Sequence, residues 1–304
     1  MKKILITGGS GFIGTELISQ LLREKFIIHC LDINKPKIKK NKKLKFYKGN
    51  LFDRKIIQRA MSGCEIVIHL AAYLGVENTD KNVSKCLDEN IYGTKLVIDI
   101  AKKYKVRSFI FSSSSEVYGD QRKFPIKENA ELKNKSVYGS SKIIAEHYVR
   151  DSFNNFNQSH IIVRFFNVYG PNQKENFVIK KFIKKIKNNK SLTVYGKGNQ
   201  VRSFCYVSDS VNALVKLIKL NVKNQTFNIG NPCEPISMKK LASKIIKISK
   251  KKIKIKYVSF DKSDRSKDRE ILKRIPCINK IKSKINYVPK VSLAEGIKKI
   301  LQRI

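Results

Sequence analysis

The chain has 304 residues and a formal charge of +40, because 64 lysines and arginines face only 24 acidic residues. Its length suits one large domain or two unequal ones. No run approaches the roughly 18 apolar residues that a membrane span requires, and the apolar stretch near Met1 is too short for a signal peptide, so we expect a cytoplasmic protein with no membrane partner.

Short β-like runs alternate with helical patterns through the first two thirds of the chain. We expect strands at 3–7, 27–31, 44–47, 66–70, 108–112 and 161–165, and helices at 12–23, 83–104 and 138–152. This alternation predicts an α/β fold, a Rossmann-like doubly wound parallel sheet with helices on both faces.

From about Asn167 the pattern changes to loops, helices and an alternating strand at 252–258. We therefore expect residues 1–166 to form the main domain. Residues 167–304 are expected to form mainly a smaller, interleaved C-terminal lobe that binds a ligand, with the segment at about 201–230 returning to the main domain.

A glycine-rich turn follows the first expected strand. The pattern Gly9-x-Gly11-x-x-Gly14 stands between that strand and the first helix. Glycine lets the backbone approach a pyrophosphate closely, and the phosphate then lies on unpaired N–H groups at the helix start. The turn therefore predicts a dinucleotide site, NAD or NADP. The residues expected in contact with it are Gly8, Gly11, Phe12, Ile13 and Gly14.

Asp32 ends the second expected strand, 18 residues after Gly14. A carboxylate there accepts hydrogen bonds from the adenosine ribose hydroxyls and repels a 2′-phosphate, which favours NAD over NADP. Lys35 and Lys37 lie close behind and oppose that preference.

Tyr138 and Lys142 stand four residues apart at the start of an expected helix, and hence on one face of it. A phenol has a pKa near 10, too high for a base at neutral pH. A neighbouring ammonium and an oxidised nicotinamide both stabilise the phenolate. Tyr138 is therefore a candidate base that takes a hydroxyl proton while hydride leaves the same carbon.

Taken together, these motifs resemble an extended short-chain dehydrogenase/reductase of the NAD-dependent nucleotide-sugar epimerase/dehydratase family, such as the UDP-glucose 4-epimerases and UDP-glucuronate decarboxylases. The matching segments follow in order over nearly the whole chain: 7–14, 69–72, 90–94, 113–119, 138–142, 164–171, 202–209 and 227–232.

The resemblance implies specific roles. Tyr138 is the base at the sugar C4 hydroxyl, Ser114 hydrogen-bonds the same oxygen, and Lys142 tunes Tyr138 and holds the nicotinamide ribose. By the same resemblance, Asn50, Leu51, Leu70, Ala71, Ala72 and Asn90 contact the cofactor, and Asn167, Arg202 and Arg274 contact the nucleotide diphosphate. Guanidinium groups match phosphate oxygens well. Asn50 departs from the family, which has an acid there, but its amide oxygen can accept from the adenine amine.

Glu116 bears on which reaction follows oxidation to a 4-keto sugar. The pattern Ser114-Ser-Glu-Val-Tyr-Gly119 resembles the decarboxylases, whereas the segment Ala71 to Val76 lacks their Cys-Pro-Ala-Ser-Pro sequence. Ser115 replaces the aspartate of the dTDP-glucose dehydratases. We expect a UDP-hexose 4-epimerase type of enzyme, with a UDP-glucuronate decarboxylase or a 4,6-dehydratase using Glu116 as alternatives. A buried carboxylate with a structural partner is the other interpretation of Glu116.

Other classes of function fit the sequence less well. The lysines are spread along the chain, and in residues 177–187 apolar side chains recur at helical spacing with lysines on the other face, so we expect no specific nucleic-acid partner. A non-catalytic NAD sensor conflicts with the intact Ser114, Tyr138 and Lys142 set. The six scattered cysteines form no Cys-x-x-Cys pair, so no metal is expected. A homodimer through the helices near 83–104 and 138–152 is expected from the resemblance.

Overall fold

The computed structural model describes residues 1–75, 79, 81–153, 158–260 and 270–302. Its centre is a seven-stranded sheet in the order β11-β6-β5-β4-β1-β2-β3, in which every pair is parallel. The strands are β1 Lys2–Thr7, β2 Phe26–Asp32, β3 Leu44–Lys48, β4 Ile66–His69, β5 Ser108–Ser114, β6 Ser159–Phe165 and β11 Gln225–Ile229. The strand order changes direction at β1, because β2 and β3 are added on one side of it and β4, β5 and β6 on the other. In a doubly wound fold the ligand crevice opens at this point, at the carboxyl ends of β1 and β4.

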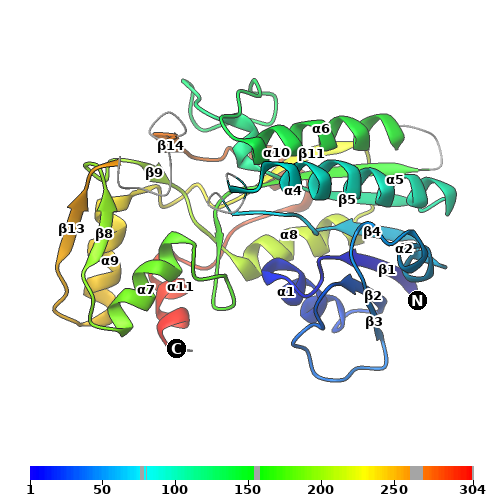
Figure 1. The fold of residues 1–304 in the computed structure, drawn as a ribbon, viewed down its shortest axis with the longest axis horizontal. Helices are drawn as coiled ribbons and strands as arrows, with labels where there is room; N and C mark the ends of the chain where they lie inside the picture. The colour runs from blue at the N-terminus through cyan, green and yellow to red at the C-terminus, as the bar shows by residue number, and fades with distance from the viewer. Residues whose placement is uncertain (76–78, 80, 154–157, 261–269, 303–304) are drawn as a thin grey trace.

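Both faces of the sheet are buried, because its strands are apolar on both sides. In β1, Ile4 and Ile6 belong to one hydrophobic core, and Leu5, which points to the opposite face, belongs to another. Helices α1 (Phe12–Leu21) and α8 (Val207–Lys219) pack together on one face. On the other face α5 (Thr94–Lys103) lies between α2 (Arg54–Met61) and α6 (Val137–Ser152), as Figure 1 shows. The expected α/β Rossmann-like fold is confirmed.

The helix expected at 83–104 is interrupted. It begins as α4 (Val83–Leu87), continues as a π-helical turn at Asp88–Gly93 and resumes as α5. Within the turn, the Asn90 side chain accepts a hydrogen bond from Tyr73 N at 2.8 Å and donates to Tyr73 O at 3.0 Å. This side chain ties the helix to the segment after β4, and a π-helical turn is a common way of aiming one side chain at such a contact.

The smaller lobe lies beyond the carboxyl edge of the sheet, at the left of Figure 1. It contains α7 (Val178–Lys187), α9 (Met238–Ser249) and α11 (Leu293–Leu301), together with the parallel pair β8 (Leu192–Tyr195) and β13 (Ile255–Val258). β13 is shorter than the strand expected at 252–258. A three-stranded sheet of β12 (Ile236–Ser237), β9 (Val201–Arg202) and β14 (Lys273–Arg274) stands between the lobe and the main sheet.

Two elements of the segment at 201–230 return to the main sheet: α8 packs on α1, and β11 pairs with β6. The remaining elements are the short pair β7 (Val168–Tyr169) and β10 (Cys205–Tyr206), and α10 (Asn279–Ile285), which packs on β11. The division of the chain at residue 166 stays a prediction.

The lysine-rich helix α7 is amphipathic as expected. Ile179, Phe182, Ile183 and Ile186 are its buried residues. The cysteines are free thiols, of which Cys233 is exposed and the other five are buried. None of the helices in the described ranges is long and apolar enough to cross a membrane. The cytoplasmic location stays a prediction.

Candidate active site

The glycine turn lies at the carboxyl end of β1, against the residues that follow β4. A Cβ atom on Gly8, whose φ is +69°, would lie 2.6 Å from Ala71 N, and one on Gly14 would lie 2.4 Å from Gly8 O. The turn therefore requires glycine at both positions. A Cβ atom on Gly11 would approach only Gly8 O, at 3.1 Å, so Gly11 faces open space rather than a packed neighbour.

The N-terminus of α1 is suited to a phosphate group. Gly11 is the N-cap and provides no side-chain hydrogen bond, and within the described chain the first turn of α1 carries no acidic residue. The N–H groups at this end are therefore available to an anion, which the positive end of the helix dipole also favours. The Phe12 ring lies close to Gly170 at the start of the smaller lobe, since a Cβ atom on Gly170 would be 3.1 Å from the ring.

Asp32 lies beside the glycine turn, as the sequence predicts. Its carboxylate accepts hydrogen bonds from Ser10 N and from Asn34 N, both at 3.0 Å. The contact with Ser10 fixes the carboxylate next to the pyrophosphate turn, at the position from which a dinucleotide's adenosine ribose is bound in this fold.

The structure does not support every contact with the cofactor that we expected after β3 and β4. The Asn50 Oδ1 atom already accepts from Phe52 N at 2.9 Å and Asp53 N at 3.1 Å. An amide oxygen has two lone pairs and both are occupied, so the expected hydrogen bond from the adenine amine to Asn50 Oδ1 is not supported. Leu51 packs against Gly93 of the π-helical turn. Asn90 is buried and holds the Tyr73 backbone, as described above, so its part in the site is to fix the loop after β4. Val76 lies outside the described residues.

Three side chains gather at the carboxyl end of β5. Ser114 is the last residue of β5, and Tyr138 and Lys142 lie on the first turns of α6, which packs on this strand. The Ser114 and Tyr138 hydroxyls form a hydrogen bond. The Lys142 Nζ atom donates to Ser112 O at 2.9 Å and lies 5.7 Å from the centre of the Tyr138 ring.

The protonation of these groups follows from their surroundings. Burial raises the pKa of Tyr138 above its ordinary value and the charge of Glu116 raises it further, whereas the hydrogen bond from Ser114 lowers it. Burial lowers the pKa of Lys142 to about 8, although Cys86 and Glu146 oppose the shift. The phenol by itself is therefore a poor base, and it needs added positive charge to ionise near neutral pH.

Glu116 connects this cluster with the smaller lobe. It lies in a 3-10 turn, Ser115–Tyr118, in which Glu116 N donates to Ser114 Oγ at 3.2 Å. Its carboxylate pairs with Arg274 Nη1 of β14 at 2.9 Å. The sequence suggested Glu116 and Arg274 for different tasks and gave no sign that they touch, because 158 residues separate them.

Arg202 and Arg274 lie side by side. They are register partners on β9 and β14, and both are buried. Arg202 pairs with Glu270 at 3.1 Å. Asn167, with a left-handed φ of 38°, donates from Nδ2 to Ser203 O at 3.1 Å and so fixes the segment next to Arg202.

Three buried polar atoms in this region have no hydrogen-bond partner among the described residues: Gln200 Oε1, Ser203 Oγ and Arg274 Nε. Each such atom costs about 1–3 kcal/mol when left unpaired. Their concentration around two arginines is typical of a site for a polar, anionic ligand.

The sequence did not single out the ion pair behind Ser114, Tyr138 and Lys142. Glu146 is fully buried and pairs with Arg164 of β6 at 2.6 Å. Burial alone would raise the pKa of Glu146, but the hydrogen bonds and charge of Arg164 lower it below its ordinary value, so the carboxyl group is ionised. The available signal was its position four residues after Lys142, on the same helix face.

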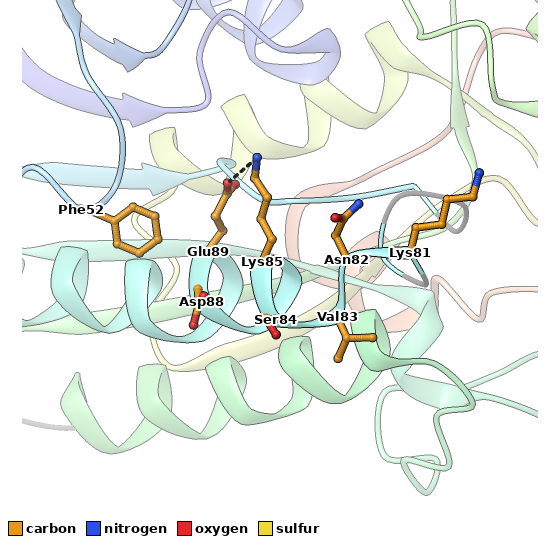
Figure 2. Close-up of a pocket in the computed structure, with 8 residues that line it drawn as sticks. All are labelled: Phe52, Lys81, Asn82, Val83, Ser84, Lys85, Asp88 and Glu89. Atoms are coloured by element: carbon orange, nitrogen blue, oxygen red, sulfur yellow. Dashed lines mark ion pairs between the residues drawn. The ribbon is translucent and has the colours of Figure 1, made fainter.

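A hollow of about 590 Å³ lies elsewhere on the surface, between Phe52 and the α4 region. Figure 2 shows that Lys85 and Glu89 form an ion pair on one side of this helix, while Val83 and Asp88 point to the other side. None of the residues lining it is Ser114, Tyr138 or Lys142, so the hollow is separate from the site described above. Among the described residues no group of histidine, cysteine and acidic side chains could hold a metal ion.

The fold and these side chains define a dinucleotide-binding protein with a Ser/Tyr/Lys site, and the comparisons with known proteins specify the class further. The model of the NAD dependent epimerase/dehydratase family matches residues 4–230. The chain belongs to this family, and the resemblance and the NAD cofactor expected from the sequence are confirmed.

Curated relatives carry several activities. The chain is 32% identical to a putative UDP-glucose 4-epimerase of Methanocaldococcus jannaschii, over 98% of this chain and 97% of that protein. It is also 32% identical to a UDP-N-acetyl-alpha-D-glucosaminuronate decarboxylase of Bacillus cytotoxicus, over 99% and 97%. A dTDP-D-glucose 4,6-dehydratase of Dictyostelium discoideum is 36% identical, over 82% of this chain and 62% of the dehydratase.

Solved structures agree in fold over the whole chain. A UDP-glucuronic acid 4-epimerase from Bacillus cereus, in complex with UDP-glucuronic acid and NAD, is 28% identical with a TM-score of 0.91, and the match covers 99% of this chain and 98% of the epimerase. A UDP-glucose 4-epimerase from Thermotoga maritima with UDP-glucose is 29% identical with a TM-score of 0.89, over the same shares.

Proposed function

We propose that the chain is an NAD-dependent nucleotide-sugar 4-epimerase that acts on a UDP-hexose through a 4-keto intermediate. The observation that carries the proposal is the convergence of Ser114, Tyr138 and Lys142 at the carboxyl edge of the sheet, the same edge as the dinucleotide turn. The ion pair of Glu116 with Arg274 connects this set to the two buried arginines. Epimerases with UDP-sugars bound are among the structures that this chain resembles.

In the proposed reaction, Tyr138 takes the proton of the sugar C4 hydroxyl while the C4 hydrogen leaves with its electron pair. Ser114 hydrogen-bonds the same oxygen, and Lys142 stabilises the phenolate. When bound, NAD supplies the positive charge that the phenol lacks and accepts and returns the hydrogen. The resulting 4-keto sugar rotates in the site, so that hydride returns to the other face of C4. Tyr138 then gives the proton back to the C4 oxygen. Substrate and product then differ only at C4.

The substrate class follows from the two arginines. Arg202 and Arg274 are buried, adjacent and close to unpartnered polar atoms. We propose that they bind the diphosphate of a nucleotide sugar through guanidinium N–H groups, of which Arg274 Nε has no partner among the described residues. The charge of the whole protein favours the approach of such an anion.

The contacts of the Glu116 carboxylate bear on whether the reaction is epimerisation, dehydration or decarboxylation. Dehydration and decarboxylation both use the 4-ketone as an electron sink, and dehydration also needs a base for the C5 proton. The Glu116 carboxylate is held by Arg274, and a carboxylate held in this way is a weak base for a carbon-bound proton. This contact favours epimerisation.

Dehydration or decarboxylation remains the second candidate, because Glu116 is close enough to Tyr138 for its charge to raise the pKa of the phenol. If a bound diphosphate draws Arg274 away, the carboxylate becomes available to the sugar.

One experiment distinguishes these reactions. The pure protein is incubated with NAD and with UDP-, dTDP- and GDP-sugars, and products are identified by mass spectrometry and NMR. We expect a UDP-hexose product of unchanged mass with inverted C4. Loss of water would indicate dehydration, and loss of carbon dioxide would indicate decarboxylation. No turnover of any sugar by protein that binds NAD would contradict the enzymatic proposal.

We also propose a homodimer formed through the α4–α5 and α6 helices. Apolar side chains on these elements are exposed: Val83, Tyr92, Ile144 and Tyr148. The π-helical turn that carries Tyr92 packs on α6, which carries Ile144 and Tyr148, so a second copy of the chain could cover both elements at once. Sedimentation velocity tests this assembly.

A further inference from the structure

The buried ion pair of Glu146 and Arg164 is attached to both β5 and α6, the elements that carry the proposed catalytic cluster of Ser114, Tyr138 and Lys142. Ser113 Oγ of β5 donates to Glu146 Oε1 at 2.5 Å. Arg164 donates to the same carboxylate twice, from Nε at 2.8 Å and from Nη2 at 2.6 Å. Glu146 therefore joins α6 to two neighbouring strands of the main sheet.

The contacts between α6 and β5 come from one face of the helix. Tyr138, Lys142 and Glu146 are spaced four residues apart on one face of α6. They meet three consecutive residues of β5: Glu146 accepts from the Ser113 hydroxyl, Lys142 donates to the Ser112 carbonyl, and Tyr138 hydrogen-bonds Ser114. Two of these contacts involve the reactive set, and the third, made by Glu146, does not.

The strands that receive these contacts are also held in place. Arg164 of β6 is the register partner of Ser113 on β5 and of Asn228 on β11. Arg164 Nη1 donates to the Tyr118 hydroxyl at 2.9 Å, and that hydroxyl donates to Asn228 Oδ1 at 2.7 Å. A buried network in which every member is satisfied has one favoured geometry, because any shift leaves a polar group unpaired.

We propose that Glu146 is a positioning residue for the reaction: through Ser113 and Arg164 it sets the register of α6 on β5, and thereby the distance of Tyr138 and Lys142 from Ser114. The inference rests on the proposed function. Displacements of about 1 Å in a catalytic group can reduce rates about a hundredfold, so a residue that touches neither substrate nor cofactor can still limit the rate.

The charge of Glu146 has a second effect. The titratable groups that face Lys142 are Tyr138 and Glu146 on α6, Cys86 on α4 and His69 on β4. His69 is uncharged, since burial lowers its pKa to about 3. Glu146 faces Arg164, Arg150 and Ser113, and its negative charge raises the pKa of Lys142. Glu146 thus keeps the ammonium protonated to a higher pH than burial alone would allow.

The test measures kcat, KM and the pH dependence of kcat on the UDP-hexose that the wild-type enzyme converts. Glu146→Gln keeps the shape of the side chain and removes its charge. We expect kcat to fall about tenfold or more with little change in KM, and the alkaline decline of kcat to begin at a lower pH, because Lys142 loses its proton more easily. Ser113→Ala leaves the ion pair intact, so we expect the fall in kcat without the pH shift.

Arg150→Gln is the matched control. Arg150 pairs with the same carboxylate at 2.7 Å, but its side chain is 35% exposed and donates its other hydrogen bond to Thr226 of β11 rather than to β5. We expect it to leave kcat and the pH dependence unchanged. If Arg150→Gln lowers kcat as much as the other two variants do, the loss of kcat does not depend on the contact of Glu146 with β5, and the proposal is wrong.

A folded Glu146→Gln protein with wild-type kcat and pH dependence would overturn the proposal. If that variant does not fold, Ser113→Ala decides alone, and wild-type kcat there would also overturn it. Crystal structures of wild type and Ser113→Ala give a readout that needs no turnover: we expect the Ser114–Tyr138 hydrogen bond to be lost in the variant, and its retention contradicts the proposal. Absence of turnover in the wild-type protein contradicts the proposed function instead.

Discussion

The carboxylate of Glu116 is paired with the guanidinium of Arg274 at 2.9 Å, which connects the turn after β5 to β14 across 158 residues of the chain. This contact places a negative charge beside Tyr138 and an arginine expected to bind phosphate beside the catalytic cluster. The binding and the reactive parts of the site are therefore electrostatically linked through one residue pair.

We predict that Glu116→Gln preserves epimerisation and moves its pH dependence. The charge of Glu116 raises the pKa of Tyr138, so the neutral amide lets the phenolate form at a lower pH. The rise of kcat with pH should then begin at a lower pH than in the wild type. Glu131→Gln, which removes an exposed carboxylate paired with Lys133, is the control. Complete loss of turnover in Glu116→Gln would favour dehydration or decarboxylation.

The pKa of Lys142 predicts an alkaline limit to activity. Burial lowers this pKa to about 8. The ammonium is needed to stabilise the phenolate and is present below that pH, so kcat should fall as pH rises through about 8. Lys142→Met should lower kcat about a hundredfold, the scale of an acid–base contribution. Lys142→Arg keeps its charge, so the activity that it retains should not decline above pH 8; a decline like that of the wild type would contradict the assignment.

Two glycines of the dinucleotide turn should respond differently to alanine. The Cβ of Gly14→Ala would lie 2.4 Å from Gly8 O, against backbone, so we expect a loss of about 1–3 kcal/mol in the free energy of unfolding. The Cβ of Gly11→Ala meets only Gly8 O at 3.1 Å and otherwise enters the open space above the turn. That variant should remain folded and bind NAD more weakly. Thermal unfolding and an NAD titration measure the two effects; equal destabilisation of both variants would contradict this assignment.

Asp32 should set the choice between NAD and NADP. Its carboxylate is fixed beside the turn by Ser10 N, and a second negative charge near it is unfavourable. In Asp32→Asn we expect the ratio of NADP to NAD affinity to rise about tenfold or more, because the repulsion of the 2′-phosphate is removed. Asp99→Asn, on the exposed side of α5, is the control. An unchanged ratio in Asp32→Asn would show that the carboxylate does not face the ribose.

The local sequence pattern was sufficient to predict the cofactor turn and six of the seven strands of the main sheet. The seventh strand, β11, was expected only as part of the segment at about 201–230 that returns to the main domain. Each of the six predicted strands coincides with a short β-like run, and the glycine spacing is imposed by contacts within the turn itself, such as that of Gly14 with Gly8. The same holds for Tyr138 and Lys142, since the period of one helix places them together.

The sequence could not predict contacts that depend on tertiary pairing. Arg274 reaches Glu116 only because β14 pairs with β9 beside the main sheet, and neither strand is longer than two residues. No periodic pattern in the sequence marks the π-helical turn around Asn90. The turn is stabilised by the contact of the Asn90 side chain with the Tyr73 backbone, which depends on tertiary structure. The oxygen of Asn50, expected at the adenine, is engaged by its own loop, which residue type alone does not reveal.

The most direct test of the central claim follows a deuterium label on C4 of the UDP-hexose. If C4 is oxidised and the same hydrogen is returned, the wild-type protein with NAD should give product of unchanged mass, with inverted C4 and deuterium still at C4, while Tyr138→Phe gives almost none. Loss of the label to solvent, or full activity of Tyr138→Phe, would contradict a 4-keto mechanism that depends on this tyrosine.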